Sequence, residues 1–398
     1  MDIKKIRSGI ETYWLTTVYA ILSFVVLDQL LAYRLATLVH GSSVHELSAL
    51  GVDQTLGLLL KNPTNAIYRL PMISLNFFDR LNVYHVRLLS TVFALLTVLL
   101  TYYILRRWQG MRTAIIGSAL LVTSSWFLTY ARTATSDIIY PFLITVGIAY
   151  GTWSRRTKNN NRVLVLGTLV VISFIYTPGL IYFVIPGIIW QRKTLSKQIQ
   201  DSPTAAIVSM ILLFVFVIPL AFAVFKQPEL INTLFIFSSN ILSTPSKLYS
   251  NLISSLKVLI INGQPDPSLG VAGMSMVDLF TGSMAALGAY MLAIDNRLDR
   301  AKMILGYLFV STLIISIGGP DKLVIMLPVI YILASLGISY MIVSWLEVFP
   351  RNPLARYVGI GIVCAVVGLT CIYHLDRYFV AWPNSPDTIK AFHLTRVK

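Results

Sequence analysis

The chain has 398 residues, of which 56% are hydrophobic and only 12% are charged, and its formal net charge is +15. A soluble globular protein carries roughly 25% charged residues, so this composition excludes an ordinary soluble enzyme. The apolar residues form runs of about 18 or more, which is long enough to cross a hydrocarbon core. The basic residues lie in short clusters between these runs, as the positive-inside rule predicts, and this placement excludes nucleic acid as a partner.

The first apolar run covers about residues 14–33 and follows Lys4, Lys5 and Arg7. Basic residues before a span favour a cytoplasmic N-terminus. The run lacks a small-residue cleavage site, so it is predicted to be an anchor and not a signal peptide. Asp28 lies inside it, and an ionisable residue in a span usually faces the interior of a bundle.

A polar loop follows at residues 34–84 and is predicted to be external. A loop of this length usually has a function. Ser43 and Glu46 fit a capping box, in which the serine bonds the third amide and the glutamate reaches back. Glu46 therefore has two interpretations, which are a helix cap alone or a general base for an acceptor hydroxyl. Residues 44–60 carry an apolar stripe and are predicted to form an interfacial helix, in which Asp53 is a weaker catalytic candidate.

The same loop contains an Asn62-Pro63 turn followed by Tyr68 and Arg69. An arginine can hold a phosphate through two hydrogen bonds. Tyrosine and arginine are also common anchors at a membrane surface. A phosphate contact and a membrane anchor therefore remain equally good interpretations of the pair.

The second and third spans are predicted at about 85–105 and 112–131, and a tight external turn with Arg132 and Asp137 follows. Asp137 fits a cap of the fourth span. The alternative is that it binds a divalent ion, for which Mg²⁺ or Mn²⁺ suits carboxylate and water ligands, or that it orients Arg132 on a phosphate.

Residues 163–190 are apolar but have basic clusters at both ends. A single crossing would place one cluster outside, against the positive-inside rule. Two short helices that break at residues 176–179, Tyr-Thr-Pro-Gly, keep both clusters inside, and Pro-Gly supplies the turn. The next span is predicted at 203–225, and a second long external segment at 226–276.

The remaining spans are predicted to end near residue 373 and to leave the C-terminus external. Lys322, in the turn after Gly-Gly-Pro, faces the same side as the long loop and is a candidate phosphate contact. The total is roughly 11 transmembrane helices in a single transmembrane domain, residues 1–398. The histidines lack metal-ligand spacing and are predicted to have no site role: His40, His45, His85, His374 and His393.

The order of these features resembles the GT-C superfamily of polyprenyl-phosphate-dependent glycosyltransferases, in the branch that contains protein O-mannosyltransferases and aminoarabinose transferases. The resemblance covers residues 30–155 well and the rest only by the number of spans. It is carried by Glu46, Asn62-Pro63, Arg69-Leu-Pro71, Arg87 to Ser90, Leu105-Arg-Arg107, Ser124-Ser-Trp126, Ala131-Arg132, Asp137 and Leu327-Pro328.

The resemblance implies that Glu46 is the catalytic base, that Arg69 contacts the donor phosphate and that Asp137 is the second-loop acid. The family usually has two acids in its first loop, whereas residues 44–46 here, Val-His-Glu, contain one. An inactive member of the family is therefore one alternative.

We expect an inverting sugar transferase of the plasma membrane that takes its donor from a polyprenyl phosphate. The acceptor, which is a lipid, a glycan or a protein, would enter from outside. Glu46 and Asp137 are the catalytic candidates, and Arg69, Arg132, Tyr68 and Lys322 are the donor-phosphate candidates. A transporter or lipid flippase that uses Asp28, and a structural scaffold, are the alternatives from other functional classes.

Overall fold

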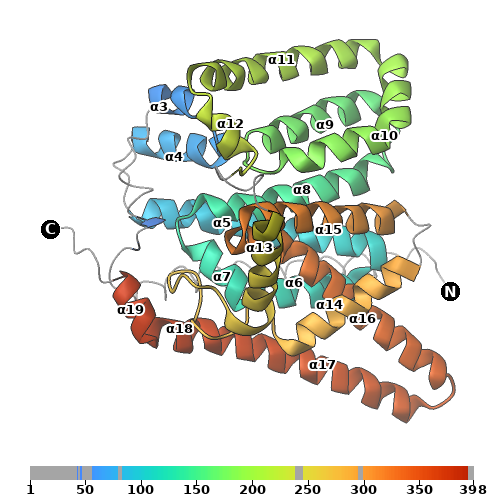
Figure 1. Cartoon of the computed structure of the whole chain (residues 1–398). Helices are drawn as coiled ribbons and strands as arrows, with labels where there is room; N and C mark the ends of the chain where they lie inside the picture. The colour runs from blue at the N-terminus through green and yellow to red at the C-terminus, as the bar shows by residue number, and fades with distance from the viewer. Residues whose placement is uncertain are drawn as a thin grey trace.

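Helices account for every regular element in the computed structural model, which describes residues 43, 45–46, 56–78, 83–237, 245–294 and 299–392 (Figure 1). The predicted first span with Asp28, and most of the predicted helix at 44–60, lie outside the described residues. The longer helices are α4 (Ala66–Phe78), α5 (Val83–Gln109), α6 (Met111–Thr123), α7 (Ser125–Arg132), α8 (Ile139–Ser154), α9 (Asn160–Ile175), α10 (Ile181–Asp201), α11 (Pro203–Lys226), α13 (Pro245–Lys257), α14 (Leu279–Ile294), α15 (Asp299–Gly318), α16 (Leu327–Val348) and α17 (Pro353–Asp376).

Short helices connect these elements and close the chain. They are α3 (Leu56–Lys61), the 3-10 helix η2 (Ser136–Ile138), α12 (Glu229–Leu234), the π-helix η3 (Val258–Asn262), the 3-10 helix η4 (Pro320–Met326), the π-helix η5 (Arg377–Ala381), α18 (Trp382–Asn384) and α19 (Pro386–Phe392). Helices α3 and α4 lie within residues 34–84, the loop that the sequence predicts to be external and to contain helices.

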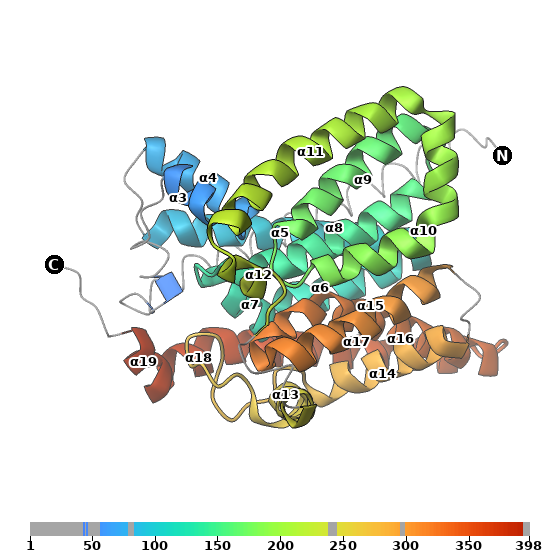
Figure 2. The same ribbon diagram turned by 45° about the horizontal axis from the view of Figure 1, so that its top comes forward.

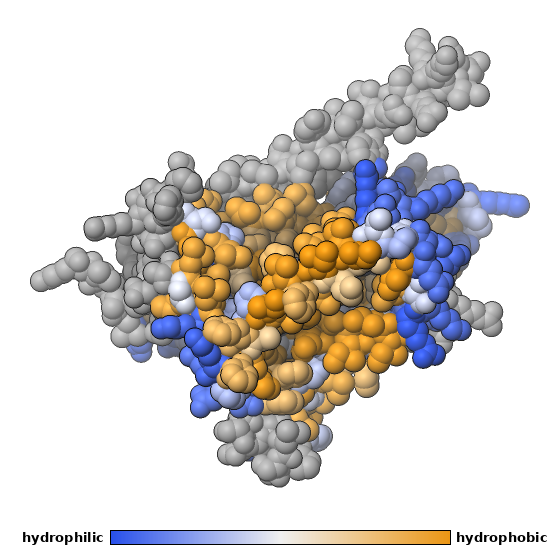
Figure 3. Space-filling view, turned by 90° about the horizontal axis from the view of Figure 1, so that it is seen from above, coloured by the Kyte–Doolittle hydropathy of each residue, from blue (hydrophilic) through white to orange (hydrophobic). Residues whose placement is uncertain are grey.

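Five helical stretches among the described residues are long and apolar enough to cross a membrane, and a bent pair makes six. Helices α9 and α14 are shorter but also apolar. The outward side chains of α11 are largely exposed hydrophobics, including Phe214 and Phe225. Figure 3 shows this apolar face as a band with hydrophilic residues at both ends, which is the surface that a lipid bilayer covers. The protein is therefore a polytopic helical membrane protein.

The third span differs from the sequence prediction because it is broken. Helices α6 and α7 meet at an angle of 60° around Ser124. The Ser124 side chain accepts a hydrogen bond from Phe127 N and so caps the start of α7. A serine cap satisfies a free amide inside the bundle, where water cannot, and this stabilises the break.

The predicted break at residues 176–179 is present, because α9 ends at Ile175 and α10 begins at Ile181. Gly179 has a φ of 78°, which favours glycine, and its amide donates to Leu234 O at 2.7 Å. Asn160 at the start of α9 donates to Asp201 at the end of α10, at 3.3 Å. Both flanking basic clusters consequently lie at the same end of the molecule.

Helices α14 and α16 approach each other closely at two glycines. A Cβ on Gly288 would lie 2.0 Å from Leu333 O, and a Cβ on Gly337 would lie 2.0 Å from Met284 O. Small residues that let two backbones approach are typical of helix pairs in membranes. The whole first half of α16 is buried, so α16 lies in the centre of the core and packs α14 against one side.

The C-terminal helices pack against the loop that follows η3. Pro267 O accepts hydrogen bonds from Trp382 Nε1 at 3.0 Å and from Thr388 Oγ1 at 3.3 Å. Figure 2 shows α18 and α19 beside this loop. Two segments that are far apart in the sequence therefore close the same end of the bundle.

Candidate functional site

Glu46 forms a buried ion pair with Arg87, near the start of α5. Arg87 Nε lies 2.6 Å from Glu46 Oε1, and Arg87 Nη2 lies 3.0 Å from Oε2. The two side chains are 1% and 4% exposed, respectively. Such a two-bond arrangement is the strongest geometry for this pair of groups, and each charge compensates the other in a region without water.

The predicted capping box at Ser43 and Glu46 is also present. Ser43 N donates to Glu46 Oε2 at 2.9 Å, and Glu46 N donates to Ser43 Oγ at 3.3 Å. Both carboxylate oxygens of Glu46 therefore accept hydrogen bonds from the protein. This arrangement favours the interpretation of Glu46 as a structural residue that holds Arg87 and starts a helix.

The two residues of the first loop that the sequence predicts as phosphate contacts have different partners: Arg69 bonds the Asn62-Pro63 turn, and Tyr68 bonds α5. Arg69 Nη1 donates to Asn62 O at 2.5 Å, and Tyr68 OH lies 2.8 Å from Ser90 Oγ. Tyr68 is 2% exposed, whereas Arg69 is only half-buried. Arg69 consequently keeps N–H groups for a further acceptor, because a guanidinium has five.

Asn65 joins this first loop to the turn that carries Asp137. Its side chain donates to Ser136 Oγ at 3.2 Å, and its backbone amide donates to Tyr176 O at 2.8 Å. Its φ of 55° is one that asparagine tolerates better than most residues. The first loop, the turn at Asp137 and the break after α9 therefore lie together at one end of the bundle.

Asp137 is half-buried in η2, and its carboxylate makes no hydrogen bond with any described residue. One turn later, Tyr140 OH lies 3.4 Å from Lys322 Nζ, and that nitrogen is 5.1 Å from the centre of the Tyr140 ring. Burial raises the pKa of Asp137 above its usual value, while the charges of Lys322 and His45 oppose the rise. A carboxylate with a raised pKa and an open face is suited to accept a proton.

The sequence analysis predicts no site role for His45, yet His45 pairs with Asp266 of the second long segment, residues 226–276. His45 Nε2 lies 2.6 Å from Asp266 Oδ2, and both side chains are about two-fifths exposed. This hydrogen bond raises the pKa of His45. Burial acts to raise the pKa of Asp266, but the hydrogen bonds from His45 and Ser268 outweigh it, and the pKa lies below its usual value.

The spacing of the five histidines along the chain does not single out His45. Its partner lies 221 residues further along the chain, and a contact of that separation leaves no local pattern. The charges of His45, Asp137, Asp266, Asp321 and Lys322 act on one another. We refer to these residues as the external polar centre, after the side of the membrane that the sequence predicts for them.

Arg132 lies apart from this centre in an aromatic setting. It is 1% exposed, and its Cζ lies 4.9 Å from the ring centres of both Trp382 and Phe392. Such cation–π contacts hold a guanidinium in a fixed plane. The C-terminal helices therefore cover the residue that the sequence predicts as a donor-phosphate contact.

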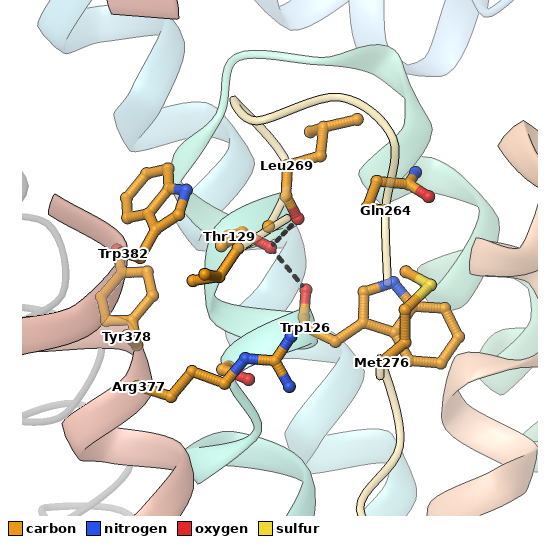
Figure 4. Close-up of a pocket in the computed structure, with 11 residues that line it drawn as sticks. Trp126, Thr129, Gln264, Leu269, Met276, Arg377, Tyr378 and Trp382 are labelled. Atoms are coloured by element: carbon orange, nitrogen blue, oxygen red, sulfur yellow. Dashed lines mark hydrogen bonds between the residues drawn. The ribbon is translucent and has the colours of Figure 1, made fainter. Parts of the chain in front are cut away.

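A small cavity lies next to α7, and none of the site residues predicted from the sequence lines it (Figure 4). Its volume is about 10 Å³, which is room for one water molecule. Trp126 Nε1, Gln264 Oε1 and Arg377 Nε line it without a hydrogen-bond partner among the described residues. Two donors and one acceptor suit the binding of a water molecule. The volume of the cavity is too small for a sugar.

Beside the cavity, Ser125, His374 and Asp278 form a hydrogen-bonded chain that the sequence analysis did not identify. Ser125 Oγ lies 3.1 Å from His374 Nδ1, and His374 Nε2 lies 2.9 Å from Asp278 Oδ2. The order matches a nucleophile–base–acid triad. However, His374 is fully buried and the adjoining cavity has room for no more than a water molecule. The hydrogen-bonded chain therefore links α7, α17 and the start of α14, and the space beside it does not fit a sugar.

Metal ligands do not gather at Asp137 in the described part of the chain. No three His, Cys, Asp or Glu side chains there lie in a group that could hold a metal ion. Among the described cationic groups, Lys322 has the largest electrostatic effect on Asp137.

Comparisons with known proteins were made for the sequence and the fold. The family model for dolichyl-phosphate-mannose-protein mannosyltransferases matches residues 31–232, which is just over half of the chain. No curated protein matches this chain at a significant level. Two crystal structures of ArnT from Cupriavidus metallidurans share its fold, each with 12% identity and a TM-score of 0.56. The apo structure aligns over 96% of this chain and 77% of that one, and the structure bound to undecaprenyl phosphate over 95% and 77%.

Proposed function

The chain belongs to the family of dolichyl-phosphate-mannose-protein mannosyltransferases, and we propose that it moves a sugar from a polyprenyl phosphate to an acceptor at the outer face of the plasma membrane. It is an integral membrane glycosyltransferase of this family. The undecaprenyl phosphate in a structure of the same fold supports a long polyprenyl phosphate as the lipid of the donor.

We assign the general base to Asp137. The observation that carries this assignment is an open, half-buried carboxylate beside Lys322, at the end of the bundle where the first loop folds back. The acceptor hydroxyl would pass its proton to Asp137 as its oxygen bonds to the anomeric carbon, and the bond from that carbon to the phosphate oxygen would break. The sequence favoured Glu46 for this step, but the contacts of Glu46 with Arg87 support a positioning role.

The departing phosphate needs positive charge, because negative charge develops on its oxygen in the transition state. The charge of Lys322 acts on Asp137, and Arg69, which is half-buried, has N–H groups beyond the one that bonds Asn62 O. We assign the donor phosphate to these two residues first. Tyr68, through Ser90, and Arg132, through its aromatic neighbours, would act one step further from the phosphate.

A divalent ion is a second way to supply that charge. Asp137 is its only predicted ligand, and the described residues offer no set of three ligands around it. We therefore propose that Lys322 replaces a metal at this position. Titration of Mg²⁺ or Mn²⁺ into a metal-free assay tests this, and a strict requirement for either ion would overturn the assignment.

The function itself is tested with purified full-length protein in liposomes and a panel of polyprenyl-phosphate sugars. Lipid, glycan and peptide acceptors are supplied in turn, and the polyprenyl phosphate that is released is measured by mass spectrometry. We expect release from at least one donor that depends on the acceptor. Folded protein that releases nothing from any donor would support the interpretation as an inactive member of the family.

A further inference from the structure

A second cavity lies at the other end of the bundle. Helix α5 carries Arg87 near its start and Arg107 near its end, and 1.5 Å per residue separates them by about 30 Å. The cavity has a volume of about 350 Å³ and opens between the ends of α5 and α8 and the start of α15. Figure 1 shows the end of α8 and the start of α15 on the same side. The lining residues are Arg107, Trp108, Gly151, Thr152, Arg155, Arg156, Asp299, Arg300 and Met303.

The lining is strongly basic, with four arginines against a single acid, Asp299. Asp299 Oδ2 lies 3.2 Å from Arg155 Nη1, at a partly exposed position. Arg156 Nη2 donates to Arg107 O at 3.0 Å. One carboxylate therefore neutralises one guanidinium, and the cavity keeps a net positive charge.

Arg300 has a donor that no described residue satisfies. Its Nη1 donates to Trp108 O at 3.0 Å, which fixes the guanidinium against the cavity wall. Its Nε has almost no exposed surface and no hydrogen-bond partner among the described residues. A buried charged donor without an acceptor is costly, and a ligand with acceptor oxygens would satisfy it.

The floor of the cavity is rigid. Trp108 Nε1 donates to Thr152 Oγ1 at 3.1 Å and so joins α5 to α8. A Cβ on Gly151 would lie 3.0 Å from Met303 Sδ, so the glycine lets α15 approach. Trp190 of α10 stacks on Arg155, whose Cζ is 5.3 Å from the ring centre. The pocket is therefore preformed, which lowers the cost of binding.

We propose that this pocket binds the phosphate of an anionic membrane lipid, in the leaflet opposite the external polar centre. Basic residues at the edge of a membrane are common, but single charges there extend into water. Here they line a cavity of a size typical of ligand sites. A phosphodiester oxygen accepts guanidinium hydrogen bonds well, and basic pockets between helices suit anionic headgroups.

Native mass spectrometry of the full-length protein, reconstituted with equimolar phosphatidylglycerol and phosphatidylcholine, tests the proposal. We expect the wild type to retain phosphatidylglycerol preferentially. Arg300→Gln and Arg107→Gln should each weaken this binding about fivefold, because a basic residue near an anionic surface contributes about that factor. Arg192→Gln is the matched control, since Arg192 is exposed on α10 and does not line the pocket.

Arg107→Gln keeps the test valid if Arg300→Gln disturbs folding. The Arg300 side chain bonds Trp108 O of α5, whereas the Arg107 guanidinium lies over the Tyr103 ring of its own helix. Asp299→Asn should act in the opposite direction and strengthen binding, since it frees Arg155. Equal retention of the two lipids, or a loss in Arg192→Gln as large as in the pocket variants, would overturn the proposal. Displacement of the lipid by millimolar inorganic phosphate would overturn the lipid assignment in favour of a soluble phosphate ligand.

Discussion

Glu46 and Asp137 are both acids of external segments, but their surroundings give them different chemistry. The carboxylate of Glu46 accepts hydrogen bonds from Arg87 and from Ser43 N. Asp137 accepts none from the described residues and faces a lysine. The sequence singled out both residues as catalytic candidates. Their surroundings depend on more distant parts of the chain: the partner of Glu46 lies 41 residues away, and Lys322 acts on Asp137 from a later turn.

Replacement of Glu46 by glutamine should destabilise the protein. The variant leaves Arg87 buried without a counter-charge, and removal of one partner of a buried pair costs about 3–5 kcal/mol. Thermal unfolding in detergent measures the change, with Glu46→Gln/Arg87→Met as the paired variant that removes both charges. If Glu46→Gln unfolds like the wild type but loses transfer, Glu46 is the base and our assignment to Asp137 is wrong.

The pair of His45 and Asp266 should make stability depend on pH. The raised pKa of His45 means that its contribution is present below the ordinary value of 6.5 and disappears as the pH rises through the higher folded value. The lowered pKa of Asp266 means that its contribution is present above 3.8 and disappears as the pH falls through the lower folded value.

The melting temperature of the wild type minus that of His45→Gln should accordingly be largest between about pH 4 and 6.5 and shrink in alkali. The wild type and His45→Gln are measured in the same series of buffers. A difference that stays constant across the series would show that the pair is not an ion pair in solution.

At the scale of helices, hydrophobic periodicity and charge located most of the elements. Charge on both flanks of residues 163–190 identified the break between α9 and α10. The sequence did not predict the break between α6 and α7, because Ser124 and Ser125 are compatible with a continuous apolar helix. The bend is seen only in the structure, where the Ser124 side chain accepts a hydrogen bond from Phe127 N. The contact of α14 with α16 was also not predictable, since glycines in a span do not indicate which helix they face.

Gly337→Ala should weaken the contact between α14 and α16. Its Cβ would lie 2.0 Å from Met284 O, so one backbone must move. Overpacking of this kind costs about 1–3 kcal/mol, and the melting temperature should fall. Gly361→Ala in α17 is the control, because a Cβ there meets nothing within 4 Å. A Gly337→Ala variant as stable as this control would contradict the close packing.

At the scale of the whole molecule, the described helices place the external polar centre and the basic pocket at opposite ends of α5 and α8. The family and the membrane class followed from the sequence. The direction of insertion is predicted from the basic clusters between the spans.

Cysteine labelling tests the direction. In a background of Cys364→Ser/Cys371→Ser, Lys158→Cys and Lys197→Cys should react only with reagent inside the cell. Asp387→Cys on α19 should react from outside, and all three positions are exposed. Labelling of Lys158→Cys from outside would reverse the orientation and move the proposed active site to the cytoplasm.

The most direct test of the account is the single-turnover release of polyprenyl phosphate by Asp137→Asn, with the donor that the panel identifies. Asparagine keeps the shape of the side chain but cannot accept the proton. Loss of a general base typically costs 10²- to 10⁴-fold in rate, so we expect at least a hundredfold decrease with an unchanged melting temperature and unchanged donor binding. Asp387→Asn, which alters an exposed acid on α19, should release polyprenyl phosphate at the wild-type rate. Release by Asp137→Asn within a few-fold of the wild type would contradict the assignment of catalysis to the external polar centre.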